Sequence, residues 1–368
     1  MIYLDSGATS FRKPACVYRA AEKAMRSCAN PGRGGYEAAM EASRQLYRCR
    51  ENGAKLFRCR PEQVVLTGSC THGLNIAIRS LVKPGGKVAV SGFEHNAVVR
   101  PLYALGAEVT VAGRKLFDRE NTLEEFEKVL KTAEAAVFTH VSNVFGYILP
   151  VEEMAELCRQ RGVPFIIDAA QSAGTLPVDF EKLGADFIAM PGHKGLLGLQ
   201  GTGLLLCRDR GQPLLYGGTG SASLSREMPE DLPERLEAGT MNVPGFAALA
   251  EGMEYLSRVG TETIRQREHR QLLRCIRGLR NLGMEVFSGP DQASTVSFRP
   301  GMDCEEAAEL LARQGIAVRA GLHCAPVAHE SAGTAGTGTV RVSFGFDAAN
   351  AQTDAFLRAA SKLSPFRK

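Results

Sequence analysis

Short apolar runs alternate with amphipathic stretches over the first half of the chain. The runs predict seven strands, at 62–68, 87–92, 107–113, 135–143, 164–171, 185–192 and 202–208. Helical patterns lie between several of them, at 71–82, 122–131 and 151–162. This alternation of strand and helix predicts an α/β fold, with a mostly parallel sheet covered by helices on both faces.

The pattern changes after about residue 245. Two long helical patterns are followed by strands interleaved with helices, the strands at 284–289, 294–300, 316–321 and 339–345. Another helix is predicted after Asp303, which can cap it with Glu306 completing a capping box, and Gly315 ends it. Its apolar stripe makes Cys304 a core residue. The second half therefore predicts a smaller α+β domain.

The length of 368 residues is comfortable for two domains. We expect residues 1–15 to form an N-terminal segment that packs with the small domain. Residues 16–250 would form the large domain, and residues 251–368 the small one.

Charge and composition exclude several classes of protein. The 44 Lys and Arg residues exceed the 40 Asp and Glu residues by only +4, too little to argue for binding to nucleic acid or an anionic membrane. No run of about 18 apolar residues predicts a membrane span, and Asp5 interrupts the apolar run that a signal peptide needs. Ten cysteines are scattered without a CxxC pair, so we expect free thiols in a reducing cytoplasm.

Polar residues follow the predicted strands at the sheet edge where ligands bind in such folds. Lys194 lies in a glycine-rich turn, where desolvation would free its amine for Schiff-base chemistry; a surface lysine is the alternative. Asp168 ends an apolar strand, so it needs a cationic partner such as a protonated pyridine nitrogen, unless it caps a helix. The turn 69–73 begins a helix and suits a phosphate, although many strand-to-helix turns share this feature.

Cys324 differs from the other cysteines because it falls outside any apolar periodicity, in a turn after a strand. His323 is adjacent and Arg319 lies nearby, and positive neighbours favour a nucleophilic thiolate. The segment 327–338 is rich in Gly, Ala and Thr, so we expect it to form a mobile loop. A metal site of His323, Cys324 and His329 is an alternative that no second ligand pair supports.

Together these features resemble the fold type I pyridoxal 5′-phosphate (PLP) enzymes of aminotransferase class V. The resemblance covers essentially the whole chain and includes the segments 3–9, 94–95, 168–171, 192–194 and 237–242. The segment 318–325 resembles the cysteine-bearing motif of cysteine desulfurases, in the subgroup related to selenocysteine lyase. The fold implied is a PLP-dependent transferase with a mostly parallel seven-stranded sheet.

The resemblance also implies roles for individual residues. Lys194 would bond covalently to PLP, Asp168 would pair with its pyridine nitrogen, and Gln171 would hydrogen-bond its ring hydroxyl. His95 would stack on the ring and move protons. Further cofactor contacts would come from Asn143, from Cys70, Thr71 and His193 around the phosphate, and from Thr240, which would reach the cofactor of a partner subunit.

For the substrate, Arg341 would clamp the carboxylate through two parallel hydrogen bonds, with Asn143 and Arg319 beside it. The implied reaction converts L-cysteine to L-alanine and leaves the sulfur on Cys324 as a persulfide for an acceptor protein. Thr240 implies a homodimer. No metal is expected.

Some positions depart from the family pattern. Pro191 stands where relatives carry a serine that contacts the phosphate, the turn 69–72 differs from the usual one, and Leu322 replaces a more polar residue. The alternatives are therefore a lyase acting on L-selenocysteine, another class V aminotransferase, and a catalytically idle scaffold. The last is disfavoured because Lys194, Asp168, Gln171 and Arg341 occur together.

Overall fold

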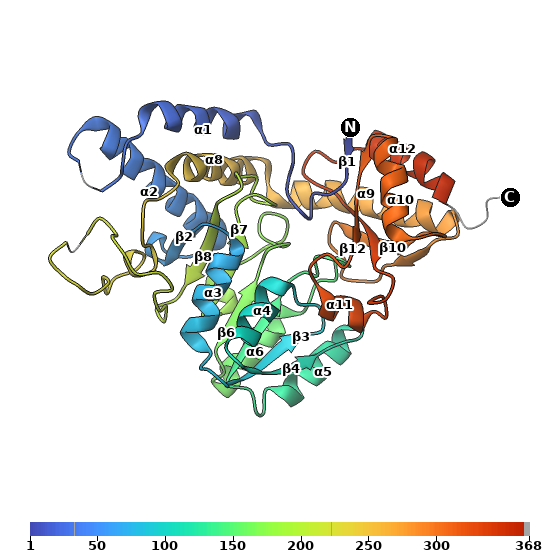
Figure 1. Cartoon of the computed structure of the whole chain (residues 1–368), viewed down its shortest axis with the longest axis horizontal. Helices are drawn as coiled ribbons and strands as arrows, with labels where there is room; N and C mark the ends of the chain where they lie inside the picture. Colours follow the sequence, from blue (N-terminus) through green and yellow to red (C-terminus); the bar gives the residue numbers. More distant parts are fainter. Residues whose placement is uncertain (33, 222, 364–368) are drawn as a thin grey trace.

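The computed structural model describes residues 1–32, 34–221 and 223–363, and Figure 1 shows the course of the chain. The predicted strands of the first half form one seven-stranded sheet in the order β2-β8-β7-β6-β5-β3-β4. Neighbours are parallel except β8, which is antiparallel to β2 and β7. The strands are β2 (Val64–Thr67), β3 (Lys87–Ser91), β4 (Glu108–Ala112), β5 (Ala135–Thr139), β6 (Phe165–Asp168), β7 (Phe187–Pro191) and β8 (Gly203–Cys207). The α/β fold with a mostly parallel sheet is confirmed.

Helices cover both faces of this sheet. Successive strand residues face opposite sides, so an apolar strand presents apolar side chains to both faces. In β5, for example, Phe138 belongs to a core shared with α2, α5, α6 and α8, whereas Val137 belongs to a core shared with α3 and α4. The helices of this half are α1 (Ala15–Ser27), α2 (Glu37–Phe57), α3 (Cys70–Leu81), α4 (Asn96–Ala104), α5 (Arg119–Val129), α6 (Val151–Arg161), α7 (Phe180–Leu183) and α8 (Val243–Val259).

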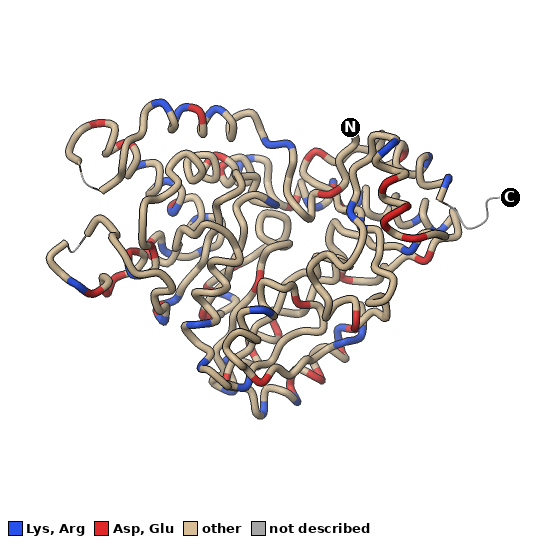
Figure 2. The backbone as a smooth tube through the Cα atoms, viewed as in Figure 1, with Lys and Arg blue, Asp and Glu red and all other residues tan. Residues whose placement is uncertain are grey.

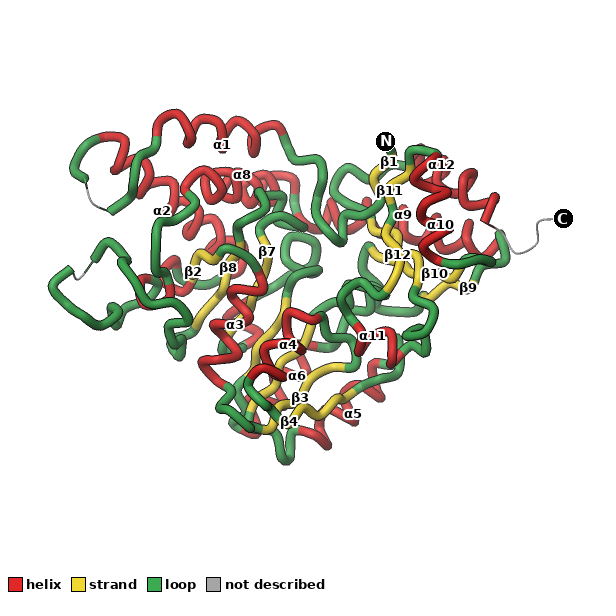
Figure 3. The backbone as a smooth tube through the Cα atoms, in the orientation of Figure 1, coloured by secondary structure: helices red, strands yellow, loops and turns green. Residues whose placement is uncertain are grey.

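The second half builds a four-stranded antiparallel sheet in the order β12-β13-β10-β9, drawn beside α9, α10 and α12 in Figure 3. Its core includes Cys304, which is 5% exposed, as its helical spacing predicts. The elements are α9 (Thr261–Asn281), β9 (Glu285–Phe287), β10 (Thr295–Arg299), α10 (Cys304–Arg313), β11 (Ile316–Ala317), β12 (Arg319–Gly321), α11 (Pro326–Ser331), β13 (Thr339–Ser343) and α12 (Asn350–Ala360).

The N-terminal strand β1 (Ile2–Tyr3) lies against the second half, where it pairs in parallel with β11. The boundary predicted at residue 250 falls inside α8. The exact domain limits stay a prediction. The mobile loop expected after Cys324 is wrong over 326–331, where the chain forms α11. Composition misled here because Pro326 suits the first turn of a helix, and buried contacts of His329 hold the segment in place.

Figure 2 shows Lys and Arg interspersed with Asp and Glu around the outside of the molecule. The Arg-rich stretch 265–280 forms most of α9, whose inner face carries Leu272 and Leu279. Within 1–32, 34–221 and 223–363, no helix combines the length and the apolar character needed to cross a bilayer.

Candidate active site

A cavity of about 300 Å³ lies where the carboxyl ends of the strands of the large sheet meet the second half of the chain. Both halves contribute side chains to it, including most of the residues expected to carry chemistry. They are Cys70, Thr71, His95, Asn143, Asp168, Gln171, His193, Lys194, Arg319, Cys324 and Arg341. A cavity with several convergent polar groups is the usual form of a small-molecule site.

Lys194 lies in the turn after β7, and the residue as a whole is half-buried. Burial lowers the pKa of its amine, and the nearby carboxylate of Asp168 partly opposes this shift. The backbone of the turn is fixed, because the hydroxyl of Ser10 donates to the Lys194 carbonyl at 3.1 Å. A desolvated amine with a lowered pKa is a better nucleophile than a surface lysine.

Asp168 ends β6 and is 2% exposed. Its carboxylate accepts hydrogen bonds from the Ala170 amide at 2.9 Å and from the Cys70 thiol at 3.5 Å. Burial, followed by the charge of Asp168, raises the pKa of Cys70 well above its ordinary value. Cys70 is therefore a thiol donor to Asp168 and not a reactive thiolate.

His95 caps α4, and its Nδ1 accepts a hydrogen bond from the Ala97 amide at 3.0 Å. Burial lowers the pKa of the imidazole, so it is neutral with its proton on Nε2. His193 is also neutral, because burial lowers its pKa to about 4, and its Nδ1 lies 3.0 Å from the hydroxyl of Thr9.

The start of α3 forms the end of the cavity that suits a phosphate. Ser69 caps this helix by accepting a hydrogen bond from the His72 amide at 3.1 Å. The first-turn amides of Cys70 and Thr71 have no partner within a helix and lie at the positive end of its dipole. Pro191 lines the same end without a hydroxyl to offer.

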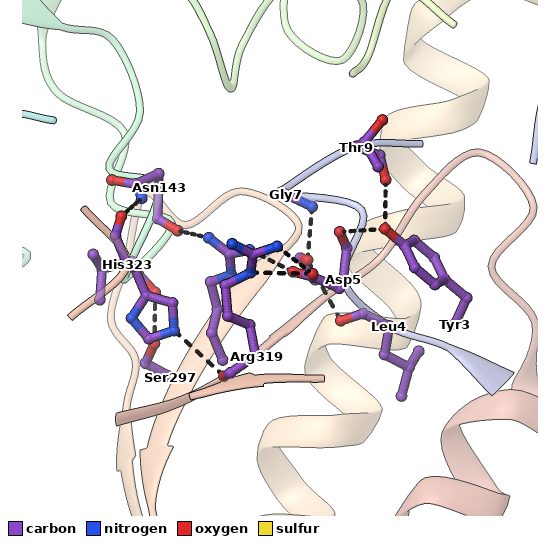
Figure 4. Close-up of polar contacts among 12 residues, drawn as sticks. Tyr3, Leu4, Asp5, Gly7, Thr9, Asn143, Ser297, Arg319 and His323 are labelled. Atoms are coloured by element: carbon purple, nitrogen blue, oxygen red, sulfur yellow. Dashed lines mark hydrogen bonds and ion pairs between the residues drawn. The ribbon is translucent and has the colours of Figure 1, made fainter. Parts of the chain in front are cut away.

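Asp5 joins Arg319 and Arg341, two arginines that line the cavity, and Figure 4 shows its contact with Arg319. Its Oδ1 accepts from Arg341 at 2.5 Å, and its Oδ2 accepts from Arg319 Nε and Nη2 at 3.1 and 3.0 Å. Arg341 also donates through Nη1 to the carbonyl of Asn143 at 3.0 Å. Two guanidinium groups sharing one carboxylate leave a net positive charge for an anionic ligand.

Two buried polar atoms in this region have no hydrogen-bond partner among the described residues. They are Nε of Arg341 and Oδ1 of Asn143, and both side chains line the cavity. Because buried polar groups are normally paired, each indicates a ligand group. The guanidinium would take a carboxylate, and the amide oxygen would accept from a hydroxyl or an amine.

Cys324 is exposed, whereas its neighbours His323 and Ala325 are buried. Both His323 and Cys324 have left-handed backbone angles, with φ of 52° and 56°. Three hydrogen bonds hold this turn: the Asn96 amide donates to the Cys324 carbonyl, the Asn143 side chain to the His323 carbonyl, and the Ala325 amide to the Leu322 carbonyl.

Two further predicted residues, Gln171 and Thr240, lie in different surroundings, and their roles stay predictions. Gln171 lines the cavity, and its side-chain amide donates to the Gly7 carbonyl at 2.9 Å. Thr240, which was expected to reach the cofactor of a partner subunit, lines a separate open cavity of about 580 Å³, beside Tyr47 and the ion pair of Arg50 and Glu237.

The cavity has the donor set that PLP requires. A buried amine is available for an aldehyde, a buried carboxylate for a ring nitrogen, and a helix start for a phosphate. The unpaired Asn143 oxygen adds an acceptor for a hydroxyl. The residues present therefore fit the cofactor.

Fold and site together are those of a fold type I enzyme, and comparisons with known proteins agree. The sequence model of the family described as Aminotransferase class-V matches residues 2–356. A probable cysteine desulfurase of Pyrococcus abyssi is 33% identical over 94% of this chain and 89% of its own, and one of Methanothermobacter thermautotrophicus is 32% identical over 90% and 88%. The solved apo cysteine desulfurase of Thermococcus onnurineus superposes with a TM-score of 0.91 at 31% identity, covering 99% of this chain and 94% of that one. The chain belongs to the class V aminotransferase family, in the branch of the cysteine desulfurases.

Sequence reasoning did not predict the contacts of several residues around the site. Asp5 belongs to the segment 3–9 named above, but no local pattern reveals its pairing with Arg341, 336 positions away. Glu94 is fully buried, its Oε1 accepts from the Thr139 amide at 2.8 Å, and burial raises its pKa to about 8. His329 was weighed only as a metal ligand, yet its nitrogens contact His323 and a threonine hydroxyl.

Proposed function

We propose that this protein is a PLP-dependent cysteine desulfurase, which converts L-cysteine to L-alanine and takes the sulfur on Cys324. The observation that carries the proposal is that the buried amine of Lys194 and the exposed thiol of Cys324 line one cavity. A class V enzyme that only transfers amino groups has no need of a thiol there.

In this scheme Lys194 would hold the cofactor through Nζ, Asp168 would pair with its ring nitrogen, and Gln171 and His95 would contact the ring. The start of α3, with Thr71 and His193, would hold its phosphate. The bound cofactor supplies an electron-withdrawing ring that stabilises negative charge at the substrate α-carbon.

The substrate carboxylate binds Arg341, which is already oriented by Asp5 and by the Asn143 carbonyl. A planar guanidinium held in this way can offer two donors to a carboxylate without reorganising. Arg319 adds positive charge at the cavity wall. The side chain of Asn143 remains free to accept a hydrogen bond through Oδ1.

Lys194 Nζ moves the proton from the substrate α-carbon, because burial lowers the pKa of the amine and so favours the neutral form that can accept a proton. Neutral His95, with its proton on Nε2, is a second group placed to donate or accept a proton in the cavity.

Sulfur transfer balances without an external oxidant. The Cys324 thiolate supplies the electron pair of a new S–S bond to the substrate sulfur. The Cβ–S bond breaks with its electrons left on Cβ, which takes a proton and becomes the methyl group of alanine. Cys324 ends as a persulfide, and an acceptor protein or a small thiol removes its outer sulfur.

A homodimer is part of the proposal. Thr240 lies in a cavity apart from Lys194, so it contributes to PLP binding only across a subunit interface. Exposed aromatic residues occur on this side of the molecule, including Tyr47, which is 52% exposed and lines the Thr240 cavity. Light scattering of the purified protein should give twice the chain mass.

The test is an assay of alanine and sulfide from L-cysteine, with dithiothreitol as the sulfur acceptor. The parent should produce both in equal amounts, and Cys324→Ala should lose sulfide release while it keeps the cofactor absorbance. Borohydride treatment of the parent should attach the cofactor permanently to Lys194. Full sulfide release by Cys324→Ala would refute the role of the thiol.

The same assay separates the alternatives. A lyase specific for selenocysteine would form alanine from L-selenocysteine but not from L-cysteine. An aminotransferase would form no alanine from L-cysteine, and an idle scaffold would stay colourless after PLP is added.

A further inference from the structure

Behind the Cys324 turn lies a chain of buried polar side chains, His323, His329 and Thr334. His323 Nε2 lies 3.3 Å from the carbonyl of Arg319, and His323 Nδ1 lies 3.4 Å from His329 Nε2. His329 Nδ1 lies 2.7 Å from the hydroxyl of Thr334. His329 and Thr334 have no exposed surface, and His323 is 8% exposed.

The two imidazoles meet edge to edge. Their planes differ by only 10°, and their centroids are 5.6 Å apart while the facing nitrogens of His323 and His329 are 3.4 Å apart. The nitrogens therefore lie on the line between the ring centres, as an in-plane N–H···N hydrogen bond requires.

The Arg319 carbonyl determines which nitrogen of each histidine is protonated in this row of hydrogen bonds. Burial lowers the pKa of His323 to about 3 and that of His329 to about 4, so each ring carries a single proton. The Arg319 carbonyl can only accept, so His323 is protonated on Nε2 and accepts through Nδ1. His329 then donates through Nε2 and accepts the Thr334 hydroxyl proton through Nδ1.

This row of hydrogen bonds ends at Arg319, which lines the cavity. The Arg319 residue that receives the first hydrogen bond also binds Asp5 through its guanidinium (Figure 4). At the other side, His323 and Cys324 have positive φ values, which are strained for residues with a side chain. Such strain persists only where surrounding contacts stabilise it. The hydrogen bonds of the His323 side chain are among these contacts.

We propose that His329 and Thr334 are positioning residues for Cys324, which act through His323 to hold the strained turn that presents the thiol to the cavity. This inference rests on the proposed function only for the use made of the thiol. The hydrogen bonds that hold the turn exist in the protein without substrate.

The test compares variants of the holoenzyme that remove or keep the hydrogen bonds. His329→Phe removes both bonds and keeps a ring, whereas His329→Gln can still donate and accept. Thr334→Val removes the hydroxyl at constant shape. Thr353→Val is its matched control, because Thr353 is equally buried and donates to the Gln271 side chain at 2.8 Å, away from the cavity.

Two readouts are needed. In His329→Phe and Thr334→Val, kcat for alanine formation should fall about ten-fold, or about 1.4 kcal/mol of transition-state stabilisation, at unchanged KM. Hydrogen exchange should show lost protection of the Ala325 amide, which closes the Cys324 turn. His329→Gln should restore both, and Thr353→Val should change neither.

The inference is overturned if His329→Phe matches the parent in kcat and in exchange, or if Gln is no better than Phe. Should His329→Phe fail to fold, the comparison of Thr334→Val with Thr353→Val decides, and equal kcat in those two overturns it. A parent that forms no alanine from L-cysteine would refute the proposed function instead, and the exchange experiment would still test the inference.

Discussion

Glu268 gives the most quantitative test of the electrostatics around the site. It lies on α9, is 3% exposed, and borders a small cavity of about 30 Å³ that also touches Lys194 and Gln171. Burial raises the pKa of its carboxyl from 4.5 to about 8, although a hydrogen bond from Ser294 partly opposes the shift. The folded protein therefore keeps this carboxyl protonated at neutral pH.

The sign of the effect on stability follows from proton binding. Between the unfolded pKa of 4.5 and the folded pKa of about 8, the folded state binds the proton and the unfolded state does not. The stability that Glu268 contributes is thus complete below pH 4.5 and is lost as the pH rises through 8. The loss is about 1.4 kcal/mol per pH unit, or about 2 kcal/mol between about pH 6 and pH 7.5.

Glu268→Gln removes the titration and keeps the shape. The other ionisable groups are present in both proteins, so the difference in unfolding free energy between variant and parent isolates Glu268. Urea unfolding at a series of pH values should show this difference moving in favour of the variant by about 1.4 kcal/mol per pH unit. A difference that is constant with pH would refute the claim that burial keeps Glu268 protonated.

Three further substitutions test the carboxylate clamp and the cofactor pocket. Arg341→Lys should raise KM for L-cysteine about 10- to 100-fold, because an ammonium cannot replace the planar fork that binds Asp5 and the Asn143 carbonyl; an unchanged KM would contradict the clamp. Asp5→Asn should lower the unfolding free energy by about 3 kcal/mol in urea, because it leaves the buried Arg341 charge without its anion; parent-like stability would show that the pair is not needed. Asp168→Asn should weaken PLP binding at least ten-fold in a fluorescence titration, since a neutral amide cannot hold a ring proton; parent-like affinity would remove Asp168 from the pocket.

Much of the fold could be predicted because its signals are local. The central strands of the large sheet are continuous apolar runs, since residues such as Val137 and Phe138 are buried on opposite faces, whereas the edge strand β4 alternates between exposed and partly buried residues. Helix α4 was not predicted, because it begins at a histidine cap and contains Pro101. The composition of α11 is typical of a turn, so the sequence predicts a loop where the chain forms a helix.

The site could be predicted only in part. Lys194 and Asp168 follow strands, so topology places them on one sheet edge. The partnership of Asp5 with Arg319 and Arg341 joins the two ends of the chain, and no spacing encodes it. The contact of His323 with His329 depends on a turn of positive φ, which the residue types there do not announce.

The most direct test of the central claim is to locate the transferred sulfur after a single turnover with L-cysteine. Mass spectrometry of the alkylated peptides should find one added sulfur atom on the peptide that contains Cys324, in step with the alanine formed. Alanine produced while that peptide stays unchanged would contradict the claim that Cys324 receives the sulfur.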